Sequence, residues 1–166
     1  MPSHTVLPAA PAAADARLTL LHAWLAPLNL VQPESLRPAS TDASFRRYFR
    51  VDVLAGRQGE LGPTLIVMDA PPPQEDVGTF IHVAGVFGAS GVSVPAIVAQ
   101  DVAQGFLLLS DLGSCTYLQR LNGDTAGALY AEALAALTSI QQHSEPGVLP
   151  EYDRATLLRE MQLFPE

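Results

Sequence analysis

The chain has 166 residues, of which 48% are hydrophobic and 16% are charged, and its formal net charge is −8. This length and composition indicate one globular domain with a core of its own and exclude a disordered chain. Acidic residues outnumber basic ones 17 to 9, which argues against a nucleic-acid partner, because phosphate backbones are bound by basic surfaces.

Residue usage adds three expectations. All basic residues are arginine and lysine is absent, so a mechanism that needs lysine requires a substitute. The single cysteine, Cys115, excludes an internal disulfide and suits a reducing cytoplasm. No apolar run approaches the ~20 residues of a membrane span, and the N-terminus lacks a signal-peptide pattern. We therefore expect a soluble cytoplasmic protein with no membrane partner.

The N-terminal part of the chain predicts an arm, a helix and a lead-in. Residues 1–13 are rich in alanine and proline and predict a flexible arm. Apolar residues at helical spacing predict a helix over residues 15–27, where a proline ends it. Residues 31–40 contain two prolines and predict an irregular lead-in, with a short strand at residues 36–38 at most.

The stretch TDASFRRYFRVDV at residues 41–53 combines a turn with a strand. Small, turn-forming residues come first, and the following residues alternate as in a strand. One face would carry Phe45, Arg47, Phe49, Val51 and Val53, and the other Arg46, Tyr48, Arg50 and Asp52. The basic cluster (Arg46, Arg47 and Arg50) could hold an anion such as phosphate beside the turn. The alternative is a β-hairpin with solvated arginines.

The rest of the chain predicts an antiparallel sheet followed by helices. The polar, glycine-rich residues 55–63 predict a hairpin loop, and the apolar run at 64–70 predicts a strand covered on both faces. After three prolines, residues 74–88 predict an amphipathic helix. Two strands are predicted at 92–100 and 105–110, and then only helices, at 117–121, 124–143 and 153–163. The fold class is therefore α+β, with about five strands and one inserted helix.

Five segments together carry a resemblance to a known family. They are DASFRRYFRV (42–51), LIVMDAPP (65–72), GVSVPAIVAQD (91–101), GFLLLSDLG (105–113) and LLREMQLFPE (157–166). The chain resembles the aminoglycoside phosphotransferase-like kinase superfamily, and within it the bacterial branch that phosphorylates N-acetylmuramate and N-acetylglucosamine at the anomeric hydroxyl. The resemblance implies a protein-kinase-like, nucleotide-binding N-lobe over residues 14–110. Residues 111–166 would be the connector and the first helices of a C-lobe.

The resemblance implies that this lobe binds ATP, with its phosphates beside residues 42–47. Backbone amides of Ala43, Ser44 and Phe45 would cover the phosphates, with Arg46 and Arg47 close by. Where the wider kinase fold carries a phosphate-binding lysine on its third strand, this chain has Met68. One arginine of the basic cluster could supply the missing cation, and the sequence leaves open which one.

The adenine base would lie at the connector between the lobes, which falls on residues 109–113. The resemblance implies that the Ser110 carbonyl and the Leu112 amide hold the edge of the base. Leu109 would lie behind the ring, and Ile66 and Val51 would help to sandwich it. The acid that pairs with the phosphate-binding cation in kinases would be Glu75 or Asp76. Both could instead serve only the dipole of the helix that they begin.

The catalytic residues of the superfamily are not found in this chain. Its H-x-D-x-x-x-x-N loop supplies the catalytic carboxylate, and a later acidic segment binds Mg²⁺, yet none of the four histidines is followed two residues later by aspartate. Asp111-Leu112-Gly113 resembles a metal-binding D-[FL]-G motif, but it lies at the connector with no catalytic loop before it. We therefore expect a truncated kinase, inactive alone, whose parent protein phosphorylates a sugar. The alternatives are a non-catalytic nucleotide- or partner-binding module and a structural interaction domain.

Overall fold

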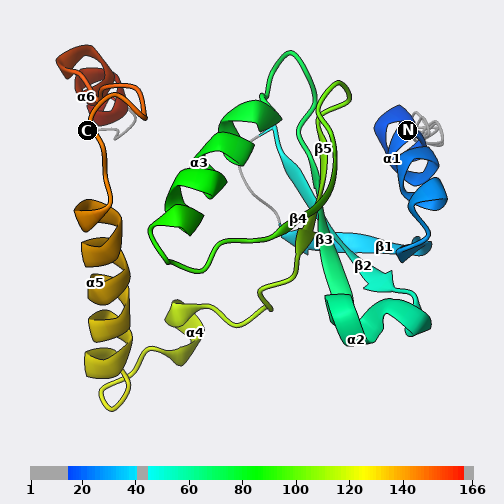
Figure 1. Ribbon diagram of the computed structural model, residues 1–166, viewed down its shortest axis with the longest axis horizontal. Helices are drawn as coiled ribbons and strands as arrows, with labels where there is room; N and C mark the ends of the chain where they lie inside the picture. The colour runs from blue at the N-terminus through cyan, green and yellow to red at the C-terminus, as the bar shows by residue number, and fades with distance from the viewer. Residues whose placement is uncertain (1–14, 41–44, 163–166) are drawn as a thin grey trace, which may run out of the picture.

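A computed structural model describes residues 15–40 and 45–162, so the expected arm at residues 1–13 lies outside the described residues. A five-stranded sheet lies between helices α1 and α3, and further helices follow it (Figure 1). The strands are β1 (Val31–Ser40), β2 (Arg47–Val53), β3 (Thr64–Asp69), β4 (Ile97–Asp101) and β5 (Phe106–Ser110). The α-helices are α1 (Ala16–Leu25), α2 (Gln58–Leu61), α3 (Val77–Ala89), α4 (Tyr117–Arg120), α5 (Ala126–Gln142) and α6 (Arg154–Met161).

The sheet has the strand order β1-β2-β3-β5-β4, and every neighbouring pair is antiparallel. Helix α3 is inserted between β3 and β4. The predicted α+β fold, with five strands, one inserted helix and then helices only, is confirmed. None of the described helices is long and apolar enough to span a membrane.

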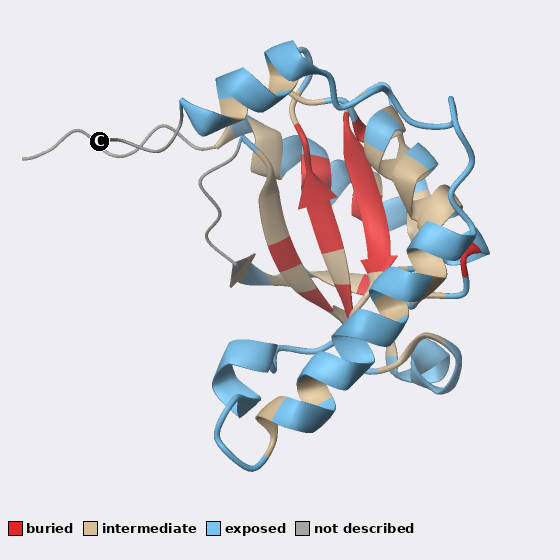
Figure 2. Ribbon diagram, turned by 90° about the vertical axis from the view of Figure 1, so that its left-hand side faces the viewer, coloured by how far each residue is buried: buried red, intermediate tan, exposed pale blue. Residues whose placement is uncertain are grey.

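Strand alternation divides the buried side chains between the two faces of the sheet. On one face, Val51 and Val67 pack with Leu21 and Leu25 of α1. On the other face, the sheet forms a second core with Val77 of α3; its other members are Met68, Ala70, Leu107 and Leu109. Figure 2 shows that the buried residues gather in the central strands, whereas α5 is largely exposed. The sheet therefore has an α1 face and an α3 face.

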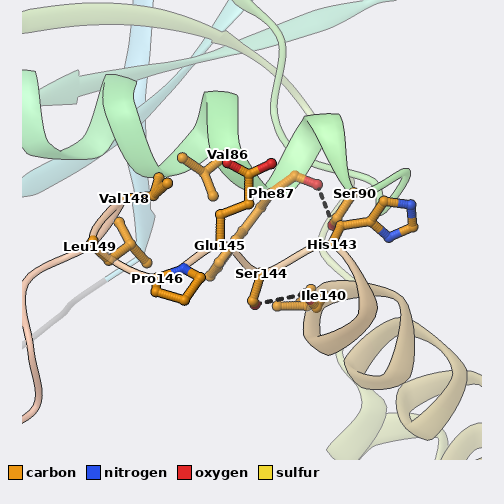
Figure 3. Close-up of a pocket in the computed structure, with 11 residues that line it drawn as sticks. Val86, Phe87, Ser90, Ile140, His143, Ser144, Glu145, Pro146, Val148 and Leu149 are labelled. Carbon is orange, nitrogen blue, oxygen red and sulfur yellow. Dashed lines mark hydrogen bonds between the residues drawn. The ribbon is translucent and has the colours of Figure 1, made fainter.

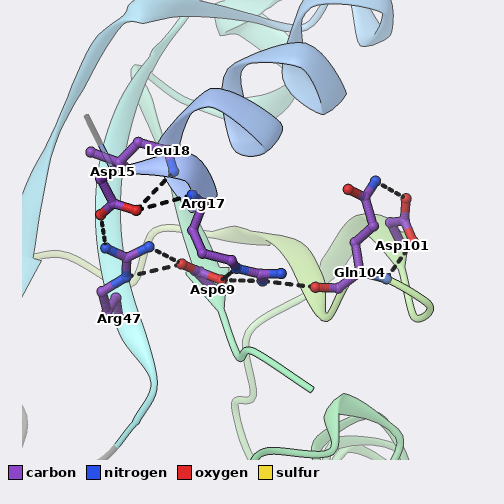
Figure 4. A network of polar contacts seen from close by, with 7 residues as sticks. All are labelled: Asp15, Arg17, Leu18, Arg47, Asp69, Asp101 and Gln104. Carbon is purple, nitrogen blue, oxygen red and sulfur yellow. Dashed lines mark hydrogen bonds and ion pairs between the residues drawn. The ribbon is translucent and has the colours of Figure 1, made fainter. Parts of the chain in front are cut away.

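An ion-pair network around Asp69 joins α1 to the α1 face of the sheet (Figure 4). Asp69 ends β3 and is fully buried. It accepts hydrogen bonds from Nε of Arg17 at 3.1 Å and from Nε of Arg47 at 2.9 Å. Arg17 also donates to the Gln104 carbonyl at 2.7 Å. Arg47 pairs with Asp15, the N-cap of α1, and lowers the pKa of that carboxyl.

The expectation for residues 31–40 is wrong, because the local sequence does not reveal the strand with which they pair. Residues 31–40 form a complete strand instead of an irregular lead-in. β1 is an edge strand with two register shifts against β2, and edge strands tolerate proline. The expected hairpin loop at 55–63 does join the antiparallel strands β2 and β3, and it contains a 3₁₀ turn and the short helix α2.

Two boundaries were also placed too early. Helix α3 begins at Val77, because the Asp76 side chain accepts a hydrogen bond from the Gly78 amide at 2.8 Å and caps the helix. Strand β4 begins at Ile97, not at residue 92. By contrast, Asp153 is the N-cap of α6, as expected from the sequence, and accepts from the Thr156 amide at 2.8 Å.

Candidate functional site

A cavity of about 210 Å³ lies on the α3 face, where β5 passes into the connector. Strands β2 and β3, helix α3 and the connector all contribute to its wall. The lining residues are Tyr48, Ile66, Phe80, Pro95, Leu109, Ser110, Asp111, Leu112 and Gly113. Most of the wall is apolar, and the polar groups are concentrated at the connector. Such a wall suits a flat, largely apolar group with a polar edge.

The structure brings together four of the five residues that the sequence analysis placed around a base. Ile66, Leu109, Ser110 and Leu112 all line this cavity. Val51 does not, because it is fully buried on the α1 face. Val51 is opposite Leu65 in the β2–β3 register, whereas Ile66 is opposite Arg50, so strand alternation directs Val51 and Ile66 to opposite faces.

Five lining residues were not anticipated as site residues: Tyr48, Phe80, Pro95, Asp111 and Gly113. Strand alternation in the sequence could have indicated Tyr48, because it places Tyr48 on the same face as Arg46. Tyr48 lies opposite Met68 in the β2–β3 register, which confirms that it belongs to the α3 face. Phe80 and Pro95 reach the cavity only through the packing of α3 and the loop after it, which local sequence patterns do not encode.

The basic cluster does not act as one patch, because its three arginines pair with different carboxylates. Nε of Arg46 lies 2.8 Å from Glu75, just before α3. Arg47 lies on the α1 face in the Asp69 network. Arg50 pairs with Asp111 of the connector. Of the three, Arg46 is thus the arginine that lies beside the start of α3.

The other candidate phosphate residues have separate positions. Glu75, not Asp76, is the acid that meets an arginine, since Asp76 caps α3. Met68 is fully buried in the core on the α3 face. Phe45 is exposed, and Ala43 and Ser44 lie outside the described residues. The phosphate-binding role of these residues stays a prediction.

The connector is bound to the sheet through the Asp111 carboxylate. Arg50 of β2 donates to it from Nε at 2.5 Å and from Nη2 at 3.1 Å. The Thr64 hydroxyl of β3 donates at 2.6 Å, and the Gly113 amide donates at 2.8 Å. The hydrogen bonds from Arg50 lower the pKa of Asp111 to about 2. Asp111 is therefore ionised at neutral pH.

A second cavity, of about 260 Å³, lies between the end of α3 and the segment after α5 (Figure 3). Val86, Phe87 and Val148 give it an apolar wall. Nε2 of His82 lies 3.0 Å from the Val148 carbonyl oxygen, and the Ser139 hydroxyl donates to the Ser90 carbonyl at 2.5 Å. These two contacts join α3 to the helices that follow the connector.

Metal-ligating side chains do not gather into a cluster among the described residues. Over residues 15–40 and 45–162, no group of three His, Cys, Asp or Glu side chains is arranged to hold a metal ion. The Asp111 carboxylate is already bonded to Arg50, Thr64 and Gly113.

Comparisons with known proteins identify relatives over most of the chain. The sequence profile of the phosphotransferase enzyme family matches residues 35–166. A protein of Pseudomonas aeruginosa named N-acetylmuramate/N-acetylglucosamine kinase is 49% identical over 162 residues, which cover 92% of this chain and 46% of that protein. A protein of the same name from Pseudomonas putida is 45% identical, over 92% of this chain and 46% of that protein. Another, from Neisseria meningitidis, is 42% identical, over 84% of this chain and 41% of that protein. The chain spans about half the length of these curated relatives.

Proposed function

Because this chain belongs to the phosphotransferase enzyme family, we propose that it is the ATP-binding part of a small-molecule kinase that phosphorylates an amino sugar. The observation that carries the proposal is the cavity at the connector. Four residues expected to surround adenine, Ile66, Leu109, Ser110 and Leu112, come from β3, β5 and the connector and line this one space. Drug-sized ligands occupy pockets of about 300–1,000 Å³, so a cavity of about 210 Å³ suits a single ring system such as a purine base.

We place the phosphates of the nucleotide beside Arg46. This arginine lies near the start of α3 and is held there by Glu75, and it directly follows the residues expected to cover the phosphates. A guanidinium binds phosphate oxygens well and stays charged. The Arg46–Glu75 pair would then do the work of the lysine and glutamate that position phosphates in kinases. Arg47 and Arg50 are held by other carboxylates and are assigned no phosphate contact.

The acceptor and the chemical step are proposed from the relatives. Their names describe kinases of N-acetylmuramate and N-acetylglucosamine, and we propose an amino sugar of that kind as the acceptor. The catalytic base and the Mg²⁺ ligands are assigned to the part of the relatives' length that this chain does not span. We expect the 166-residue chain alone to transfer no phosphate, and the kinase to work in the cytoplasm with ATP.

The experiment is a calorimetric titration of the chain with ATP, comparing the unmodified chain with Arg46→Ala. A charge-assisted contact is worth about 1.5–3 kcal/mol, so the variant should bind ATP at least about tenfold more weakly. Arg159→Ala is the matched control, because Arg159 forms a solvent-exposed pair with Glu160 on α6 and should leave the affinity unchanged. Absence of ATP binding by the unmodified chain would refute the proposal and favour a partner-binding module without nucleotide.

A further inference from the structure

Both oxygens of the Asp111 carboxylate accept hydrogen bonds, and the donors come from three parts of the chain. Arg50 of β2 donates to both oxygens, Thr64 of β3 donates to Oδ2, and the Gly113 amide donates to Oδ1. The side chain of Asp111 is only 8% exposed, and that of Arg50 is 22% exposed. Charge-assisted, bidentate bonds in such a sheltered position are stronger and geometrically more specific than exposed ion pairs.

This carboxylate lies between the two residues proposed to hold the edge of the base. Asp111 follows Ser110, the last residue of β5, and precedes Leu112. Gly113 is fixed on the far side, since its amide donates to Asp111 and its carbonyl accepts from Arg50 at 3.4 Å. The contacts therefore determine the backbone on both sides of Leu112.

Apolar packing does not hold Leu112 and Gly113 in place. The Leu112 side chain is 66% exposed, and Gly113 has no side chain and a φ of +93°. A segment of this kind would have many accessible backbone conformations, and ordering each residue costs about 1–2 kcal/mol. Sheet pairing and two hydrogen bonds with Ala96 already hold Ser110, so the polar contacts of Asp111 are what orders the residues that follow it at the mouth of the cavity.

We propose that Arg50, Thr64 and Asp111 are positioning residues that hold the connector in the conformation that binds a purine base. The inference rests on the proposed function, because it assigns the base to this cavity. It also gives Arg50 a role at the base end of the nucleotide, away from the phosphates. Asp111 acts through the backbone of its neighbours and contacts no reacting atom.

The test compares three ligands, each of which probes a different part of the site: adenosine, inorganic tripolyphosphate and ATP. Asp111→Asn and Arg50→Met should lower the affinities for adenosine and for ATP by the same factor, about tenfold or more. The affinity for tripolyphosphate should be unchanged. Thr64→Val removes one neutral hydrogen bond, so its loss should be smaller, about two- to tenfold. It also provides a mild variant if Asp111→Asn fails to fold. Arg46→Ala should give the opposite pattern, with loss of tripolyphosphate and ATP affinity.

Each outcome has a distinct meaning. Equal adenosine affinity in the unmodified chain and in folded Asp111→Asn or Thr64→Val would overturn the positioning role. Loss of tripolyphosphate binding in Arg50→Met, with adenosine unaffected, would make Arg50 a phosphate ligand and would also overturn it. If the unmodified chain binds neither adenosine nor ATP, the proposed function itself fails. Arg159→Met, which removes an exposed ion pair with Glu160 on α6, should bind all three ligands as the unmodified chain does.

Discussion

The Asp69 network predicts that Arg17 and Arg47 contribute cooperatively to stability. Asp69 is fully buried and has a guanidinium on each side. Replacing either arginine by methionine leaves the carboxylate with one cation. Charge-assisted bonds are worth about 1.5–3 kcal/mol, but the two arginine side chains are 26% and 36% exposed. Allowing for solvent screening, we expect about 1–2 kcal/mol for each single substitution.

The double variant Arg17→Met/Arg47→Met leaves a buried carboxylate with neither guanidinium. Breaking a buried ion pair so that an uncompensated charge remains costs about 3–5 kcal/mol in total. The double substitution should therefore cost at least about 1 kcal/mol more than the sum of the two single ones. Urea unfolding followed by circular dichroism at pH 7 measures all four free energies of unfolding.

The control for this cycle is Arg37→Met. Arg37 pairs with Asp52 at 2.8 Å, and both side chains are more than 40% exposed, so the change should cost less than about 1 kcal/mol. Additive costs of the Arg17 and Arg47 substitutions would refute the reasoning, because they would mean that one cation matters equally whether or not the other is present.

Three further predictions concern a turn, the core and acid stability. Gly105→Ala should lower the free energy of chemical unfolding by more than about 2 kcal/mol, because Gly105 has a φ of +74° and an added Cβ would lie 2.0 Å from the Ala70 carbonyl oxygen. The control is Gly85→Ala on α3, where an added Cβ meets open space and should not destabilise the chain. Leu108→Ala, in the core on the α1 face, should cost about 2–5 kcal/mol, and a cost below 1 kcal/mol would contradict the packing described. Asp111 has a pKa of about 2 against an ordinary 3.8, so its stabilising effect is fully present above about pH 4 and is lost as the pH falls toward 2. Asp111→Asn should reduce the slope of stability against pH in this window, and an unchanged slope would count against the Arg50 pair.

Much of the fold could be predicted, because its elements carry strong local patterns. The apolar run of β3 and the helical spacing in α1 and α5 indicate their structures without any knowledge of the neighbours. β1 could not be predicted in this way. Its prolines disfavour a strand locally, and its strand conformation depends on pairing with β2, which is a tertiary contact. Likewise, the start of α3 depended on a cap formed by Asp76 and not on hydrophobic spacing.

The site was predictable only at the level of single segments. Leu109, Ser110 and Leu112 are contiguous, so the resemblance could place them together at the connector. Which residues face them across the cavity depends on register and helix packing, and this separated Val51 from the group and added Tyr48. From the sequence alone, the three arginines of the basic cluster are equivalent candidates for the phosphate-binding cation. Only their partners in space distinguish them, because each pairs with an acid at least 22 residues away in the chain.

The prolines of β1 also affect how copies of this protein associate in solution. An exposed sheet edge is a template on which a strand from another molecule can add, and such addition leads to aggregation. β1 forms one edge of the sheet, and Pro33 and Pro38 have no amide hydrogen to offer to an incoming strand. The Arg37–Asp52 ion pair adds exposed charge beside them. We expect this edge to resist strand addition, so that the sheet ends with five strands even at high protein concentration.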